Sequence, residues 1–197
     1  LTKAKKYTDA MANYRSDSEN FDEPEYDDKN DTLSPVVAGD CPAHFHAHRA
    51  DDIFTAIRIA KRFSLDYTLV HCTEGYMIAS ELAEENVKAI IGPNMTDRSK
   101  PELKNLSFDN PRILNEHGIL FSITTDHPET PIQYLPLCAS LAHKHGLPYI
   151  QALKALTVNA AKILGIDDKV GMIRQGMDAD IVVFDNDPLD IYSNVIM

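Results

Sequence analysis

From residue 35 onward, short apolar runs alternate with stretches of helical periodicity along the chain. Each run has the length of a single strand and is followed by a polar loop and a helix-like stretch. After the first run, for example, Ile53, Ile57 and Ala60 share one helical face. The pattern predicts strands at residues 43–48, 67–71, 87–93 and 119–126, and helices at 51–63, 76–84, 111–117, 133–145 and 149–164.

Four strand-helix units in succession are typical of a parallel sheet with helical crossovers. Four units are half of an eightfold barrel, whose usual length is about 250 residues. Half a barrel leaves two sheet edges open, and open edges invite pairing or aggregation. We therefore predict an α/β fold, the C-terminal half of a (β/α)₈ TIM-like barrel, and expect residues upstream of Leu1 to supply the remaining half.

The two ends of the chain differ from this regular middle. Residues 3–15 have helical character, and residues 16–31 carry a dense acidic run, broken by Pro24, that is typical of a solvated loop. Beyond Gly165, residues 170–185 are turn-rich and strand-like. The pattern predicts three parts: a helix and acidic loop at 1–34, the half barrel that carries the candidate site at 35–168, and the start of a returning small β domain at 169–197.

Composition narrows the classes of partner. The 197 residues are 44% hydrophobic, which is enough for a buried core, and they carry a formal net charge of -11. This charge repels phosphate, so we expect a small-molecule partner and neither nucleic acid nor a membrane surface. The sequence has no apolar stretch long enough for a bilayer span and no secretion signal at its start, which favours the cytoplasm. A first residue other than methionine, and a last residue inside an apolar run, suggest a piece of a longer protein.

The three cysteines add little chemistry. Cys41, Cys72 and Cys138 are odd in number and widely spaced, which disfavours a disulfide framework and a thiolate zinc site. We expect reduced thiols that behave as small side chains. Cys72 follows a candidate site histidine, but strand alternation turns it away from that histidine.

Candidate chemistry lies where three of the predicted strands end. His46 and His48 end the first, His71 ends the second, and Asp126 ends the last. The carboxyl ends of barrel strands converge on one face, where active sites are built. Histidine and carboxylate ligands suit a hydrolytic zinc site. Taken alone, a single histidine is more often structural, and Asp126 can equally cap a helix.

The carboxy-terminal residues resemble a known family. Residues 156–166, Val170-Gly171, Gly176 and residues 178–185 are similar to the metal-dependent amidohydrolases, in the group of imidazolonepropionase and the metal-dependent prolidases. His46-Ala47, His71 and Thr125-Asp126 resemble the fifth, sixth and eighth strand positions of that family's barrel. The resemblance covers about residues 35–197.

Two elements of the family's full site are not visible in their expected context, namely a first-strand HxH pair and a fourth-strand lysine or glutamate. His44-Phe45-His46 and His46-Ala47-His48 both have the HxH spacing. Only three more strands follow them, however, so we assign His46 to the fifth strand.

The resemblance implies metal-dependent hydrolysis of a C-N bond in an amide, a cyclic amide, an imidazolone-like ring or a dipeptide. It implies that His46, His71 and Asp126 hold Zn²⁺, with one or two divalent ions in the site, and that Asp126 is the general base. The neighbouring residues expected to contact substrate are His48, Arg49, Glu74 and His127. Arg49 can clamp a substrate carboxylate, or it can pair with Asp51 or Asp52.

Two other readings stay open at this point. The chain can be a fragment or a non-catalytic homologue that lacks the first-half ligands. It can also be a metal-storage or metal-sensing module built around His44, His46 and His48. A homo-oligomer is compatible with each of these readings.

Overall fold

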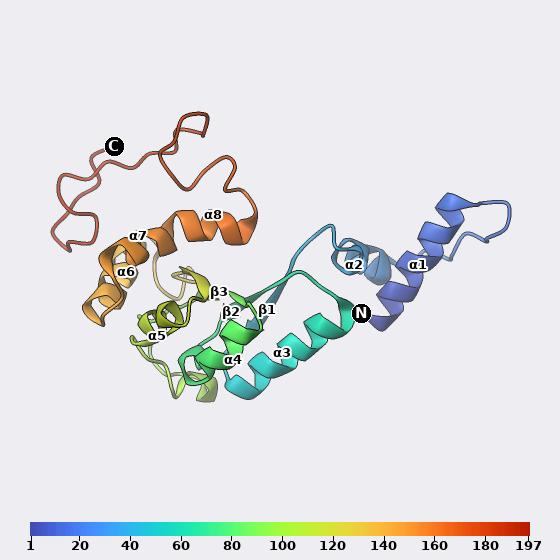
Figure 1. The fold of residues 1–197 in the computed structure, drawn as a ribbon, viewed down its shortest axis with the longest axis horizontal. Helices are drawn as coiled ribbons and strands as arrows, with labels where there is room; N and C mark the ends of the chain where they lie inside the picture. Colours follow the sequence, from blue (N-terminus) through green and yellow to red (C-terminus); the bar gives the residue numbers. More distant parts are fainter. The chain divides into compact units, whose positions relative to one another are not determined.

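The computed structural model describes residues 1–197, and its central element is a four-stranded sheet (Figure 1). The strands are β1 (Ala43–Ala47), β2 (Tyr67–His71), β3 (Lys88–Ile91) and β4 (Leu120–Ile123). The α-helices are α1 (Thr2–Ser16), α2 (Asp28–Ala38), α3 (Ala50–Phe63), α4 (Ala79–Glu84), α5 (Asn110–Glu116), α6 (Leu135–Lys144), α7 (Tyr149–Leu156) and α8 (Val158–Leu164). Short 3₁₀ helices are η1 (Gly75–Ile78), η2 (Pro101–Leu103) and η3 (Ile132–Tyr134).

The strands lie in the sheet in the order in which they occur along the chain, β1-β2-β3-β4. β2 pairs with β3 in parallel, with Val70 opposite Ile90, and β3 pairs with β4 in parallel, with Ala89 opposite Phe121. A sequential order is that of a barrel, whereas doubly wound sheets reverse their order at a switch point. The structure thus confirms the predicted α/β class and the half barrel.

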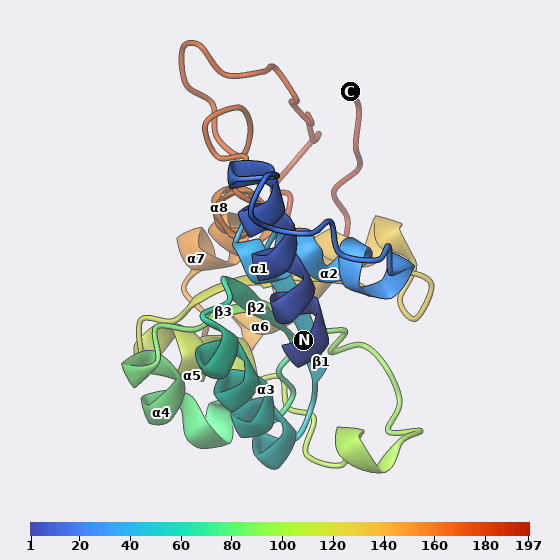
Figure 2. The same ribbon diagram turned by 90° about the vertical axis from the view of Figure 1, so that its right-hand side faces the viewer.

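Burial explains why these runs form strands. Leu69 on β2 and Ala89 and Ile91 on β3 are fully buried, and Phe121 on β4 is nearly so. Near-continuous burial on both faces is what parallel strands covered by helices require. Helices α4 and α5 lie on the same side of the strands in both ribbon views (Figures 1 and 2).

The chain divides into two compact units, one made of residues 1–44 and 55–67 and the other of residues 45–54 and 68–197. In the first unit α1 packs against α2, and the Thr8 hydroxyl donates to Ser34 Oγ at 2.9 Å. All the candidate site residues belong to the second unit. The three-part division drawn from the sequence stays a prediction.

Helix α2 is a difference from the sequence prediction, which treated residues up to Asp31 as a loop. Asp27 caps the helix by accepting a hydrogen bond from the Asn30 backbone N–H at 2.9 Å, and Gly39 ends it at φ +89°. The many acidic residues of this segment led to the loop prediction, although Asp27 and Gly39 are ordinary helix caps.

The helix predicted at 149–164 is likewise interrupted. Thr157, at φ -127° and ψ -92°, leaves the helical conformation and separates α7 from α8. Gly165 ends α8 with φ +68°, at the position where the predicted helix stops.

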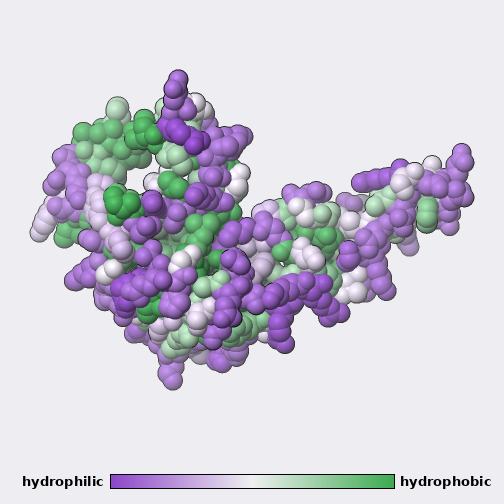
Figure 3. Space-filling view, viewed as in Figure 1, coloured by the Kyte–Doolittle hydropathy of each residue, from purple (hydrophilic) through white to green (hydrophobic).

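The carboxy-terminal segment does not form the predicted strands. A single antiparallel bridge joins Phe184 to Val195, and apolar side chains such as Ile173 and Ile196 are exposed. An isolated strand is unstable without a partner, which explains the irregular path. With α7 and α8 this segment surrounds an apolar hollow of about 890 Å³, visible in Figure 3 where hydrophobic atoms gather. The structure has no helix that is both long and apolar enough to cross a bilayer.

Candidate metal centre

Three histidines converge at the carboxyl ends of β1 and β2. Their ligating nitrogens, from His46, His48 and His71, all lie within 4.8 Å of one another. The ring of His71 lies 4.3 Å from that of His46 and 4.5 Å from that of His48, centroid to centroid. His48 and His71 are 7% and 4% exposed, whereas His46 is open to solvent.

The strand geometry accounts for this convergence. β1 and β2 are neighbours, so their carboxyl ends lie at the same edge of the sheet. Side chains two residues apart on a strand point to the same face, which places His48 beside His46 and leaves Ala47 buried on the other face. The cysteine that follows His71 is fully buried, and burial raises the pKa of Cys72 to about 12. Cys72 is therefore a buried, reduced thiol, as expected, and it lies outside the three-histidine group.

Hydrogen bonds orient two of the rings. His71 Nδ1 lies 2.7 Å from the Gly92 carbonyl oxygen, which can only accept, so Nδ1 carries the proton and Nε2 keeps its lone pair. His48 Nδ1 lies 2.8 Å from Thr73 Oγ1, and its Nε2 lies 3.0 Å from His46 Nε2. The Gly92 carbonyl thus fixes the tautomer of His71, and the Thr73 hydroxyl holds the direction of the His48 ring, as outer partners of metal-binding histidines do.

The electrostatic surroundings of His46 and His48 keep these two rings neutral. Burial, followed by the nearby His71, lowers the pKa of His46 below its ordinary value. Burial, followed by His71 and His46, lowers the pKa of His48 to about 4. At neutral pH both rings are uncharged, which is the form that binds a metal.

The backbone is unusual where the site residues leave their strands. His71, Cys72 and Asp126 adopt positive φ angles of +72°, +46° and +50°. Residues other than glycine rarely adopt this conformation, and such residues cluster at functional sites. The two predicted strand-end positions, on β2 and β4, thus share a local feature that the sequence did not predict.

Asp126 follows β4 on an exposed turn, where its backbone N–H donates to Thr124 Oγ1 at 3.0 Å. Its carboxylate is not part of the three-histidine group, although its charge raises the pKa of His46 against the effect of burial. The sequence placed Asp126 among the ligands and His48 among the substrate contacts. The structure groups His48 with His46 and His71 instead, and strand alternation was the signal for it.

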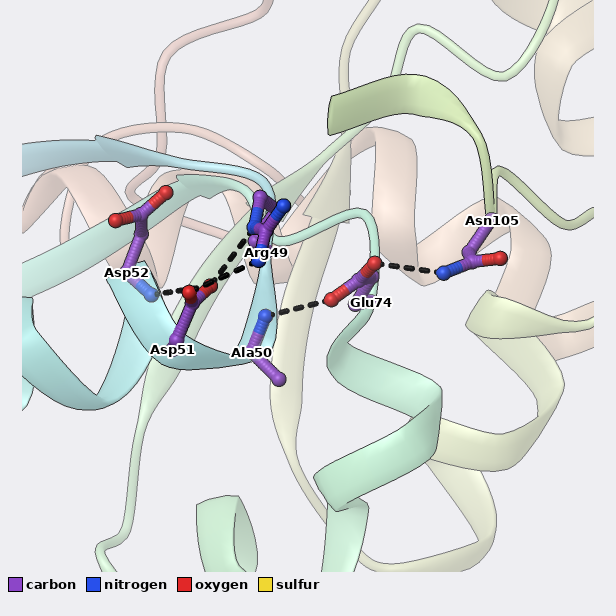
Figure 4. A network of polar contacts seen from close by, with 6 residues as sticks. All are labelled: Arg49, Ala50, Asp51, Asp52, Glu74 and Asn105. Carbon is purple, nitrogen blue, oxygen red and sulfur yellow. Dashed lines mark hydrogen bonds and ion pairs between the residues drawn. The ribbon is translucent and has the colours of Figure 1, made fainter. Parts of the chain in front are cut away.

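Two of the other predicted substrate contacts, Arg49 and Glu74, have partners within the chain (Figure 4). Arg49 makes a two-pronged ion pair with Asp51, at 2.9 and 3.0 Å. Glu74 accepts hydrogen bonds from the Ala50 backbone N–H and the Asn105 amide, each at 2.8 Å. His127 is exposed beside Asp126. Sequence reasoning did not identify Thr73, Gly92 or Asn105, because nothing local marks them.

The donor set suits zinc. Zinc binds imidazole nitrogen at about 2.0–2.1 Å in tetrahedral geometry, which places two ligating nitrogens about 3.3 Å apart. The three nitrogens of the cluster therefore need only small shifts to share one ion. Three imidazoles leave the coordination of such an ion incomplete, so a carboxylate or a water molecule can complete it.

Comparison with known proteins independently supports the family resemblance seen in the sequence. The family model described as the amidohydrolase family matches residues 41–196. An amidohydrolase structure from Thermotoga maritima MSB8 matches with a TM-score of 0.92 and 40% identity, covering 98% of this chain and 50% of that chain. The amidohydrolase tasK of Hapsidospora irregularis is 25% identical over 167 residues, covering 82% of this chain and 17% of that protein. An imidazolonepropionase of Shewanella woodyi is 43% identical over 79 residues, covering 37% of this chain and 19% of that protein.

The chain spans half the length of the Thermotoga structure and less than a fifth of the length of these two curated relatives. The matched residues contain the four strands, the histidine cluster and the carboxy-terminal segment that carried the resemblance. The sequence resemblance, the sequential parallel sheet and the family match agree, and the chain belongs to the amidohydrolase family.

Proposed function

We propose that the full protein hydrolyses a C-N bond with the help of a zinc ion held at the carboxyl ends of β1 and β2. The observation that carries this proposal is the group of three mutually oriented imidazoles of His46, His48 and His71, in which burial keeps His48 neutral. Family membership supports a hydrolase of this class.

His46, His48 and His71 would hold the zinc ion, which would polarise the substrate carbonyl and lower the pKa of a water molecule toward neutral. Asp126, as a further ligand from β4, is the general base: its carboxylate takes the proton from the water and returns it to the departing nitrogen. The exposure of Asp126 favours this shuttle, because the carboxylate can reach both water and substrate.

The substrate we propose is a small molecule with an amide-type bond, such as a cyclic amide, an imidazolone-like ring or a dipeptide. Similarity to proteins named imidazolonepropionase supports the cyclic members of this class. One ion or two, a cytoplasmic location, a homo-oligomer and an upstream half that completes the barrel are further parts of the proposal.

The test is zinc content and hydrolysis in the full protein, compared among wild type, His71→Ala and His117→Ala. His117 is an exposed histidine outside the three-histidine group, hydrogen-bonded to the Ile113 carbonyl of α5, so its loss is a matched control. We expect His71→Ala to lose zinc and turnover of cyclic amides or dipeptides, and His117→Ala to keep both.

Two other results would replace the proposal. Zinc uptake that survives His71→Ala but not loss of His44 points to the metal-storage or sensing module. Zinc without hydrolysis in the wild type points to the non-catalytic homologue. The position of His44 outside the three-histidine group favours the enzyme over the module.

A further inference from the structure

Glu74 lies where three segments of the chain meet (Figure 4). One carboxylate oxygen, Oε2, accepts from the Ala50 backbone N–H, and the other, Oε1, accepts from the Asn105 side chain, each at 2.8 Å. Its own backbone N–H donates to the His48 carbonyl at 2.9 Å. Glu74 thus joins the start of α3, the exit of β2 and the loop between β3 and α5.

Further hydrogen bonds connect two of these segments, residues 47–50 and residues 72–74. The Cys72 backbone N–H donates to the Ala47 carbonyl at 2.9 Å, and Thr73 Oγ1 lies 2.8 Å from His48 Nδ1. Hydrogen bonds therefore join residues 47–50 to residues 72–74 on both sides of His48. The backbone of His48 is held by Glu74, and its ring is held by Thr73.

The carboxylate is well suited to this place. The first N–H groups of a helix have no partner within the helix, and at the start of α3 the preceding residue, Arg49, has no side-chain acceptor to offer. Glu74 supplies that acceptor from a distant part of the chain, and a negative charge is favourable at a helix start. Both of its oxygens are engaged within the protein, which leaves Glu74 poorly placed to bind substrate.

We propose that Glu74 is a positioning residue, which fixes the turn at residues 48–50 so that His48 Nε2 points at the metal centre. This inference rests on the proposed function for its consequence, because a ring aimed elsewhere is a lost ligand. Through Asn105, the same carboxylate also anchors the loop that follows β3 to the centre.

The experiment uses the full protein as wild type, Glu74→Ala, Glu74→Gln and Asp52→Asn. Zinc affinity is measured by competition with a chromophoric chelator. The His48 tautomer is measured from ring ¹⁵N shifts in the metal-free protein. Asp52 is the matched control, because it is a carboxylate residue near the same helix start, in the first turn of α3, but its side chain makes none of the hydrogen bonds that tie residues 47–50 to 72–74.

We expect Glu74→Ala to weaken zinc binding about 10–100-fold, the range found for lost outer-shell partners, and to mix the His48 tautomers. Glu74→Gln keeps an acceptor for Ala50 and should stay near wild type, as should Asp52→Asn. If Glu74→Ala does not fold, Glu74→Asp replaces it, since it retains the charge but is too short to reach both partners, and it should weaken zinc binding in the same way.

Unchanged zinc affinity and an unchanged His48 ring in the folded Glu74→Ala or Glu74→Asp variant would overturn the inference. So would a loss in Glu74→Gln as large as that in Glu74→Ala, since charge and not positioning would then be responsible. If the wild type binds no zinc, the proposed function fails, and the ring ¹⁵N shifts of the metal-free protein still decide the role of Glu74.

Discussion

The exits of β2 and β4 make an informative comparison. Both carry a predicted site residue, and both leave the sheet through a left-handed residue, His71 at φ +72° and Asp126 at φ +50°. At the β2 exit the side chain is buried and its ring is held by Gly92. At the β4 exit the carboxylate is exposed, and the hydrogen bond that the Asp126 N–H donates to Thr124 Oγ1 holds only the backbone.

The difference follows from the chemistry proposed for each residue. An imidazole binds a metal through one nitrogen, so its tautomer and direction must be fixed by an outer partner. A carboxylate has two equivalent oxygens and, as a general base, must reach a water molecule and a leaving group. Rigid, dry surroundings suit the first task, and an open turn suits the second.

The largest effect should come from separating these tasks with Asp126→Asn. The amide cannot take up a proton, so we expect the rate of hydrolysis to fall about 10²–10⁴-fold. Zinc content should fall far less than in His71→Ala, because the three imidazoles remain. Steady-state kinetics and metal analysis on the same preparations make the measurement. A complete loss of zinc in Asp126→Asn would erase the contrast between the two exits.

Gly92→Ala should give the next largest effect, because Gly92 lies between the two exits, against His71 on one side and Thr124 on the other. A Cβ at Gly92 would lie 2.3 Å from the Thr124 backbone oxygen, and φ is +121°. We expect a loss of about 2–4 kcal/mol in the free energy of unfolding, together with weaker zinc binding as the carbonyl that orients His71 moves. Denaturant unfolding and chelator competition measure the two effects.

Gly118→Ala is the matched control for that substitution. Gly118 also has a positive φ, +71°, but a Cβ there would meet nothing within 4 Å. It should cost about 1 kcal/mol from the backbone alone and leave zinc binding intact. Equal losses in the two variants would show that the close approach to Thr124 is unimportant.

The same contrast shows what the sequence could predict. The apolar runs predicted all four strands and their order, because a buried parallel strand is a local hydrophobic pattern. His46, His71 and Asp126 followed from their places at strand ends. Strand alternation also put His48 on the face of His46, yet a substrate contact and a ligand look identical in sequence.

The partners of these residues could not be predicted. Gly92 follows His71 by 21 positions and Thr73 follows His48 by 25, and each contact depends on how parallel neighbours are aligned in space. The break at Thr157 and the irregular path after Gly165 have the same origin, since tertiary context overrides local propensity. Glu74 was assigned to substrate because its sequence position says nothing of the N–H that its carboxylate meets.

A smaller effect should appear when the metal-free protein is acidified. The pKa of His48 is about 4 in the fold, against an ordinary value of 6.5, so the unfolded chain binds more protons between these pH values. The stability that the fold gains from a neutral His48 is therefore fully present above pH 6.5. As the pH falls toward 4 it is lost, which lowers the free energy of unfolding by up to about 3 kcal/mol. Urea unfolding of wild type and His48→Gln at pH 7 and pH 5 isolates it. Equal pH dependence in the two proteins would show that His48 is not the group responsible.

The smallest effects should come from two matched threonine substitutions, one at each exit. Thr73→Val removes the hydroxyl beside His48 Nδ1, and Thr124→Val removes the acceptor for the Asp126 N–H. Each should lower the free energy of unfolding by about 0.5–1.5 kcal/mol, the usual worth of one hydrogen bond. Only Thr73→Val should also weaken zinc binding, because Thr73 holds the ring of the proposed ligand His48, whereas Thr124 contacts only the Asp126 backbone. If Thr124→Val weakens zinc binding as much, then Asp126 must be held in place as firmly as the histidines, and the open turn at β4 would owe nothing to its chemistry.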